Sequence, residues 1–225
     1  MQSALSLYRS SVGKKVVMAL SGLILFGFVV GHLAGNLKIF QGPEKYNAYA
    51  SFLRTVGAPA LGHGQLLWIA RIVLLAAVLQ HVTAALQLAR MSLRARKTRY
   101  RRRNDLSFSY ASRTMRWGGG ILLAFVVYHL MHLTFGNAHP GFNHESPYYN
   151  VVSGFQVPWV SVAYVAAMLP LGLHIYHGLW SATQTLSVRS PVIRRWRRPF
   201  AIGVAAAIVV GNISIPVAVL AGLVR

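Results

Sequence analysis

Cysteine is absent from this chain of 225 residues. Its absence excludes a disulfide framework, thiolate ligation of an iron–sulfur cluster, and covalent attachment of a c-type haem through a Cys-x-x-Cys-His motif. Acidic residues are almost as scarce, since Glu44, Asp105 and Glu145 stand against 23 lysines and arginines. All three acids lie in predicted connections, so the long apolar segments contain no carboxylate.

The chain is rich in apolar residues instead, with 55% hydrophobic and only 12% charged, a balance that excludes an ordinary soluble domain. An α-helix needs about 20 residues to cross the hydrocarbon core of a bilayer, and five apolar segments reach that length. The sequence therefore predicts an all-α integral membrane protein with one transmembrane domain, residues 1–225. The five predicted transmembrane helices are residues 16–39, 65–90, 115–137, 158–187 and 199–223.

The basic residues lie mainly before the first apolar segment, between Arg90 and Arg116, and between Arg189 and Arg198. By the positive-inside rule the N-terminus and these two connections are cytoplasmic, and the C-terminus is outside. We therefore expect a multi-pass protein of a bacterial cytoplasmic (inner) membrane. No small-residue cleavage pattern follows the first segment, so we expect it to remain in the mature protein.

The run RARKTRYRRR lies between two membrane segments, without a domain that would present it to nucleic acid. We therefore predict no nucleic-acid partner. A basic cytoplasmic face is expected to attract anionic lipid headgroups and also suits an acidic docked subunit.

Four of the five apolar segments carry histidines at membrane depth. They are His32, His81, the doublet His129 and His132, and the doublet His174 and His177. An ionisable side chain in hydrocarbon is costly, so its recurrence from helix to helix indicates a functional site. Neutral imidazoles from two facing helices can fill both axial positions of a haem iron. The pattern predicts two non-covalent b-type haems.

Depth predicts how these histidines pair. Successive helices run in opposite directions, so His32 meets the third-helix doublet near the outer side, and His81 meets the fourth-helix doublet near the inner side. The members of each doublet are three residues apart and share a helix face. Depth alone leaves both doublets open and slightly favours His132 over His129.

Small residues flank the first of these histidines. Gly27, Gly31 and Gly35 form a smooth strip along the first helix, for which we weigh two interpretations. The strip either packs closely against another helix or receives a flat macrocycle beside His32. Pro170, four residues before His174, predicts a bend in the fourth helix.

Taken together, these residues resemble the cytochrome b558 family of succinate dehydrogenase and fumarate reductase membrane subunits, the single-chain, five-helix, two-haem kind. The resemblance covers nearly the whole chain. It is carried by HLAGN at 32–36, by His81 with small residues at Ala85 and Ala89, by RWGGGILLAFVVYH at 116–129, and by HIYHGLWS at 174–181.

The resemblance implies which member of each doublet binds iron. In that family the third-helix ligand lies thirteen residues after an arginine, and the fourth-helix ligand lies four before the glycine of a Gly-Leu-Trp-like segment. On this sequence these positions are His129 and His174. The implied outer haem is held by His32 and His129, and the inner one by His81 and His174. Some members carry a membrane glutamate two residues before the fourth-helix ligand, where this chain has Gly172.

The resemblance also implies a function in respiratory complex II and the tricarboxylic acid cycle. A flavoprotein subunit oxidises succinate, and an iron–sulfur subunit passes electrons to the di-haem membrane anchor, which reduces a quinone. No catalytic residue for succinate is expected in this chain. The sequence does not distinguish menaquinone from ubiquinone or the physiological direction, and it is compatible with a higher oligomer of the whole complex.

Polar residues near the helix ends are candidates for two further roles. Charge-assisted pairing with haem propionates is expected for Ser21, Arg113, Arg116 and Ser181 on the inner side and Arg71 on the outer side. Snorkelling to the interface is the alternative for the arginines. Proton uptake at a quinone requires titratable groups at the membrane edge, for which the outer candidates are Glu44, His63 and Arg71. Residence in a solvated loop is their alternative interpretation.

Two rival functions follow from the same residues. Within the same chemistry, the chain is a cytochrome b anchor of a quinol:fumarate reductase or of another dehydrogenase. In a different class, it is a haem-free transporter whose histidines pack or relay protons. Internal repeat symmetry would favour a transporter, and the sequence contains none.

Overall fold

The computed structural model describes residues 8, 10–95, 110–186 and 190–225, and all regular structure in these residues is helical. The all-α prediction is therefore confirmed for the described part of the chain. Its elements are α2 (Ser11–Asn36), the short 3-10 helix η1 (Leu37–Gln41), α3 (Pro43–Thr55), α4 (Gln65–Arg94), α5 (Tyr110–Leu133), α6 (Pro147–Phe155), α7 (Pro158–Thr185) and α8 (Pro191–Leu220).

Four of the described helices are long and apolar enough to cross a membrane: α2 together with η1, α4, α7 and α8. They correspond to the first, second, fourth and fifth predicted transmembrane helices and give the chain the character of a multi-pass membrane protein. The third predicted helix, residues 115–137, forms α5 but is not among the four. Arg116, three consecutive glycines and two histidines lower its average hydropathy, so a fifth span stays a prediction.

Several helix boundaries differ by a few residues from those that hydropathy predicts, and two of these differences have a clear local cause. Helix α5 ends at Leu133, four residues early, because Gly136 has a positive φ of 80° and the chain turns there. Helix α8 begins at Pro191 rather than at residue 199, because a proline suits the first helical position. The guanidinium groups of Arg197 and Arg198, on its first turns, lie 5.8 and 5.2 Å from the Trp180 ring on α7.

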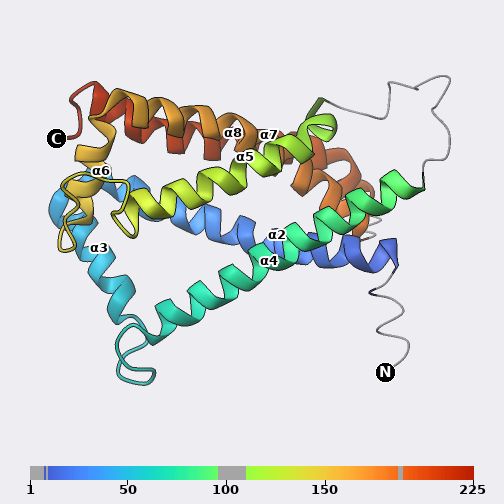
Figure 1. Ribbon diagram of the computed structural model, residues 1–225, viewed down its shortest axis with the longest axis horizontal. Helices are drawn as coiled ribbons and strands as arrows, with labels where there is room; N and C mark the ends of the chain where they lie inside the picture. The colour runs from blue at the N-terminus through green and yellow to red at the C-terminus, as the bar shows by residue number, and fades with distance from the viewer. Residues whose placement is uncertain (1–7, 9, 96–109, 187–189) are drawn as a thin grey trace.

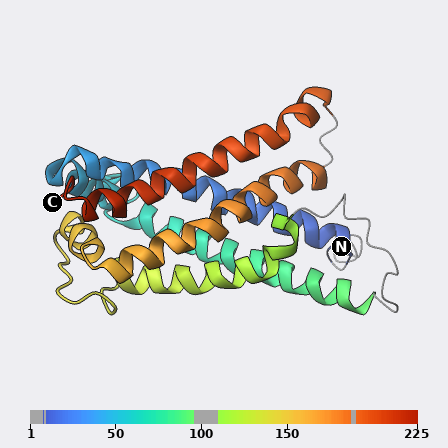
Figure 2. The same ribbon diagram turned by 90° about the horizontal axis from the view of Figure 1, so that it is seen from above.

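The helices are arranged so that α2 packs along α4, and α7 packs along both α5 and α8, with α2 also contacting α7 (Figures 1 and 2). At the right of Figure 1 lie the start of α2, the end of α4, the start of α5, the end of α7 and the start of α8. We call this the basic end. The helix ends that lie there adjoin the second-to-third and fourth-to-fifth connections, where most of the basic residues are found.

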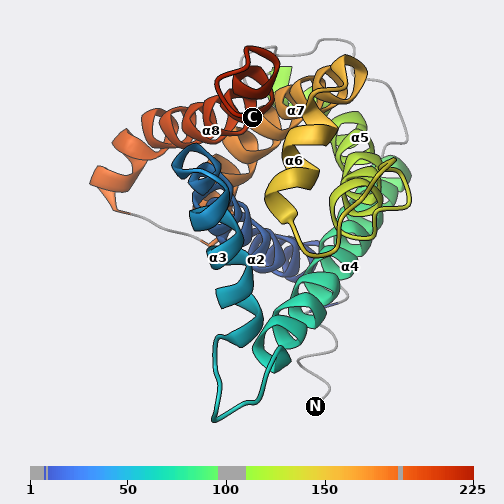
Figure 3. The ribbon, with the colours of Figure 1, turned by 90° about the vertical axis from the view of Figure 1, so that its left-hand side faces the viewer.

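The opposite end, which we call the capped end, is covered by η1, α3 and α6. Helix α6 lies between α3, α5, α7 and α8 in the view along the bundle (Figure 3) and is largely buried. Its Tyr148, Val152 and Phe155 pack against Ile39 of η1 and Ile215 of α8 in one hydrophobic cluster. Relative to exposure to water, burial of Val152 or Phe155 contributes about 1.5–3 kcal/mol each, so α6 is an integral part of the bundle.

Hydrogen bonds fix α6 in this position. The side-chain oxygen of Asn47 on α3 accepts a hydrogen bond from the Tyr148 backbone N–H at 3.0 Å. The Tyr148 hydroxyl donates to the backbone oxygen of Arg225 at 2.9 Å, and the Ser146 side chain caps the helix by accepting from the Tyr149 N–H. The N-cap and residues from two distant parts of the chain, Asn47 and Arg225, therefore hold α6 over the ends of the longer helices.

The chain has no cysteine, so single introduced cysteines can test whether α5 crosses the membrane. Ala95 at the end of α4 and Asn137 after α5 are both exposed, at opposite ends of the bundle. We expect Ala95→Cys to react with a membrane-impermeant maleimide only from the cytoplasmic side and Asn137→Cys only from the outer side. Ala48→Cys on α3 is the control and should behave like Asn137→Cys. Labelling of residues 95 and 137 from the same side would show that α5 does not cross.

Candidate functional site

Two pairs of histidines face each other across the bundle. At the capped-end pair, the rings of His32 on α2 and His129 on α5 lie with their centroids 5.8 Å apart and their planes at 89°. At the basic-end pair, the rings of His81 on α4 and His174 on α7 are 5.9 Å apart at 60°. The structure thus brings together the four histidines that the resemblance implies, in the pairing that helix direction predicts.

The second member of each doublet lies elsewhere. His132 stacks on His139 at 4.8 Å and on Tyr128 at 5.6 Å, measured between ring centroids. His177 packs edge-on against Trp180 of its own helix. Three residues along an α-helix correspond to a change of about 60° in side-chain direction, which separates His129 from His132. The depth count that slightly favoured His132 cannot detect this rotation, and the structure places His129 opposite His32.

A hydrogen bond to the backbone orients His81. Its Nδ1 lies 3.0 Å from the carbonyl oxygen of Met18 on α2 and 3.4 Å from Ser21 Oγ. A carbonyl oxygen only accepts, so Nδ1 is the protonated nitrogen and donates to it. The Nε2 lone pair is then available to a metal, the arrangement usual for a histidine ligand.

His174 has a buried ring nitrogen that no neighbour satisfies. Its Nδ1 has no hydrogen-bond partner in the part of the chain that the structure describes, and the same holds for His177 Nδ1 on the same helix, although leaving such a group unpaired costs about 1–3 kcal/mol. The residue lies in the wall of a largely apolar groove of about 660 Å³ between α5 and α7, which Phe125, Pro170 and Leu173 also line.

The glycine strip of α2 is only partly a packing surface. A Cβ added to Gly35 would collide with the ring of Tyr49, so this glycine serves close packing against α3. A Cβ at Gly27 or Gly31 would meet nothing within 4 Å. Close helix packing therefore does not account for these two glycines, which leave a smooth open face beside His32.

These features fit b-type haem. An imidazole nitrogen binds a transition metal at about 2 Å, so two rings on opposite sides of one metal have centroids about 6 Å apart. The observed separations of 5.8 and 5.9 Å are compatible with this spacing, which ordinary ring contacts such as His177 with Trp180 at 5.7 Å also show. The donor set is two imidazoles at each site, with smooth or apolar surfaces beside them, which suits a macrocycle that supplies the remaining ligands itself.

The structure places the predicted propionate partners in different environments. Ser21 is buried, with its hydroxyl donating to the Val17 carbonyl at 2.7 Å beside His81, and Ser181 donates to the Gly178 carbonyl at 3.2 Å. Arg116 is exposed on α5. The Arg71 guanidinium carbon lies 4.9 Å from the Trp68 ring centroid near the start of α4. The side chain of Arg113 lies outside the described part of the structure.

The predicted quinone residues do not converge. Glu44 is exposed in the first turn of α3, where its charge favours the positive helix end. His63 is exposed in the connection that follows α3. The 13 residues of α3 therefore separate the two by about 20 Å of helix. Arg71 contacts Trp68 as described, and no contact joins any two of the three among the described residues.

Two features of the structure were not predicted from the sequence. One is Tyr164 on α7, whose hydroxyl lies 3.2 Å from His129 Nδ1 and 3.0 Å from His132 Nδ1. Its position ten residues before His174 is about 15 Å along the helix, which already indicates the depth of the capped-end pair. Which side chain it meets depends on the packing of α5 against α7.

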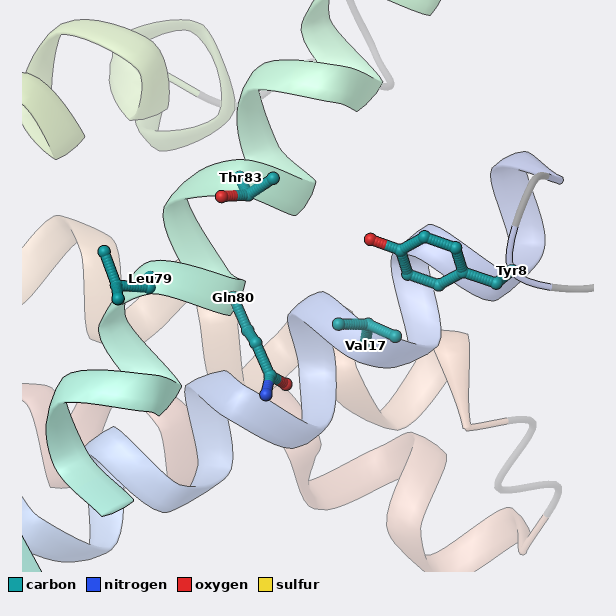
Figure 4. Close-up of a pocket in the computed structure, with 5 residues that line it drawn as sticks. All are labelled: Tyr8, Val17, Leu79, Gln80 and Thr83. Atoms are coloured by element: carbon teal, nitrogen blue, oxygen red, sulfur yellow. The ribbon is translucent and has the colours of Figure 1, made fainter. Parts of the chain in front are cut away.

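The other feature is a hollow of about 390 Å³ between α2 and α4. It is lined by Tyr8, Val17, Leu79, Gln80 and Thr83 (Figure 4). Gln80 and Thr83 are exposed midway along an apolar helix, an unfavourable place for polar side chains unless they find a partner. Gln80, which lines the hollow, directly precedes His81 of the basic-end pair in the sequence.

Comparison of the chain with protein-family models, with curated proteins and with solved structures gives no match.

Alanine substitutions test the expectation that the two facing histidine pairs hold haem. We expect His81→Ala or His174→Ala to remove the basic-end haem, and His32→Ala or His129→Ala the capped-end haem, because each iron needs both axial bonds. Haem-to-protein ratios should fall from two to one in all four variants. His132→Ala and His177→Ala are matched controls on the same helices and should retain two haems. Loss of haem in a control, with retention in the corresponding paired variant, would contradict the assignment.

Proposed function

We propose that this chain is the di-haem cytochrome b membrane anchor of a succinate:quinone oxidoreductase. The observation that supports it most is the presence of two facing histidine pairs, at two depths of an apolar helix bundle, each contributed by two different helices. The resemblance of its motifs to those of the cytochrome b558 family favours this function over that of other di-haem cytochromes.

The residues of the chain would do four things. His81 and His174 would bind one b haem, and His32 and His129 the other. The Met18 carbonyl would hold His81 with its Nε2 toward the metal. The open faces at Gly27 and Gly31 would receive a flat ring, and the surrounding apolar side chains would exclude water. The haems would carry electrons singly across the membrane.

The basic end would be the cytoplasmic side of the membrane, by the positive-inside rule. The iron–sulfur subunit, which carries the flavoprotein subunit, would dock there, because a strongly positive surface attracts acidic ones. Most of the basic connection that would take part, residues 96–109, lies outside the described residues. Electrons would enter at the basic-end pair and pass to the capped-end pair.

The quinone would be reduced near the capped-end pair. If both pairs held haem, the capped-end pair would be needed as a relay only if the acceptor lay beyond it. Glu44, His63 and Arg71 do not form one pocket, so single substitutions must identify which of them, if any, lines the site. The hollow in Figure 4 is the competing position, because Tyr8, Gln80 and Thr83 offer three hydrogen-bonding side chains beside apolar ones.

Spectroscopy tests the proposed function directly. The purified chain should show a reduced-minus-oxidised spectrum with bis-imidazole b-type bands and contain two haems per chain. The complex isolated from membranes should retain flavoprotein and iron–sulfur subunits and reduce quinone with succinate. A chain that folds in the membrane without haem would exclude a cytochrome and favour the transporter alternative. Rates of fumarate reduction by quinol would distinguish the fumarate reductase alternative.

The position of the quinone can be tested by removing the capped-end haem. In the complex carrying His32→Ala, we expect quinone reduction to be lost while succinate oxidation by a soluble dye continues, because the acceptor lies beyond the missing haem. Gln80→Leu and Thr83→Val should leave the KM for quinone unchanged. Retention of quinone reduction in His32→Ala, with a raised KM in the Gln80 or Thr83 variant, would instead locate the quinone in the hollow between α2 and α4.

A further inference from the structure

Tyr164 lies between the capped-end pair and the second histidine of α5. Its side chain is 7% exposed, and its hydroxyl is within hydrogen-bond distance of two ring nitrogens, His129 Nδ1 at 3.2 Å and His132 Nδ1 at 3.0 Å. The rings of Phe125 and Phe155 pack edge-on against it, at centroid distances of 5.0 and 4.8 Å. This packing fixes the position of the hydroxyl group.

The single proton of the Tyr164 hydroxyl determines the direction of its hydrogen bonds to His129 and His132. A tyrosine hydroxyl has one proton to donate, so it donates to one of the two histidines and accepts from the other. If His129 binds a metal through Nε2, its Nδ1 carries a proton and donates to the Tyr164 oxygen. The Tyr164 hydroxyl then donates to His132 Nδ1, and His132 carries its proton on Nε2.

We propose that Tyr164, supported by His132, is the positioning residue that sets the tautomer, ring orientation and electron-donating strength of His129. This inference rests on the proposed function, since it concerns the haem that His129 would hold. A hydrogen bond that a ligand imidazole donates makes the ring a stronger base toward its metal. The same contact explains why α5 carries two histidines although only one of them faces His32.

The two histidine pairs differ in this respect. His81 donates to a backbone carbonyl, an acceptor present whatever side chain stands at position 18. His129 donates to a hydroxyl whose own proton is committed to a second imidazole. The capped-end pair can therefore be altered by one side-chain substitution without changing either of its histidines, which makes the proposal open to a direct test.

His132 is held firmly enough for its supporting role. It is 2% exposed and lies between the rings of Tyr128 and His139. His139 is anchored in turn, with Nε2 lying 3.0 Å from the Asn150 carbonyl oxygen of α6. Gly154 of α6 leaves room for both rings, since a Cβ there would lie 2.7 Å from His132 Cε1 and 3.1 Å from His139 Nε2.

The test is the substitution Tyr164→Phe in the intact complex, with Tyr128→Phe as the matched control. Tyr128 stacks on the same His132 ring, but its hydroxyl makes no hydrogen bond to a histidine among the described residues. Redox titration and electron paramagnetic resonance report on each haem separately. The measured quantities are the reduction equilibrium of each haem and the resonance position of its oxidised form.

We expect Tyr164→Phe to favour reduction of the capped-end haem, because the weaker ligand stabilises the oxidised iron less. The expected change in the reduction equilibrium constant is about threefold to tenfold, and tenfold corresponds to 59 mV for one electron. The resonance of this haem should shift, while the basic-end haem stays unchanged and reports that the fold is intact. His132→Ala should shift the same haem in the same direction by less. Tyr128→Phe should change neither haem.

Each outcome decides the inference. Selective loss of the capped-end haem in Tyr164→Phe, with Tyr128→Phe unaffected, also supports a positioning role. Two haems with unaltered potentials and resonances in Tyr164→Phe would refute that role and leave the proposed function standing. If Tyr164→Phe does not assemble, His132→Ala decides, and an unchanged capped-end haem in that variant overturns the inference. Absence of haem from the wild-type chain would overturn the proposed function and this inference together.

Discussion

A buried imidazole in an apolar bundle requires a partner for its ring nitrogens, and much of the arrangement described above follows from this requirement. Desolvating an unpaired ring nitrogen costs about 1–3 kcal/mol, and several histidines here lie within long apolar helices. His81 meets the requirement with a backbone carbonyl, His129 and His132 share one tyrosine hydroxyl, and His139 bonds to α6. His174 keeps a buried nitrogen without a partner in the described residues. His177 Nδ1 on the same helix is likewise unpaired among these residues, so the facing of His174 and His81 is what distinguishes His174.

The same requirement explains why α6 is placed over the capped end. Helix α6 supplies the Asn150 carbonyl to His139 and, at Gly154, the space in which His132 and His139 stack. It also contributes apolar side chains to the cluster that joins η1, α7 and α8. Closing the end of the bundle and orienting its buried histidines are therefore done by one short helix, and a change in α6 would affect both.

Sequence patterns predicted the helices better than their ends. Hydropathy located the segments that became α2, α4, α7 and α8, because membrane-length apolar runs are a strong signal that depends on composition alone. The ends of α5 and α8 depend instead on local chemistry, the positive φ of Gly136 and the proline at 191. Helices α3 and α6 were not predicted, because they are short and derive much of their stability from tertiary contacts.

For the candidate site, the sequence by itself determined which helices carry histidines, their depths, and hence which helices must face each other. These properties follow from residue spacing and from the alternating direction of consecutive helices. Only the tertiary structure decided that His129 rather than His132 faces His32, that Tyr164 bonds to both, and that Glu44, His63 and Arg71 lie apart. Rotation of a helix about its axis and the packing of distant segments decide such contacts, and neither is encoded in residue spacing along one chain.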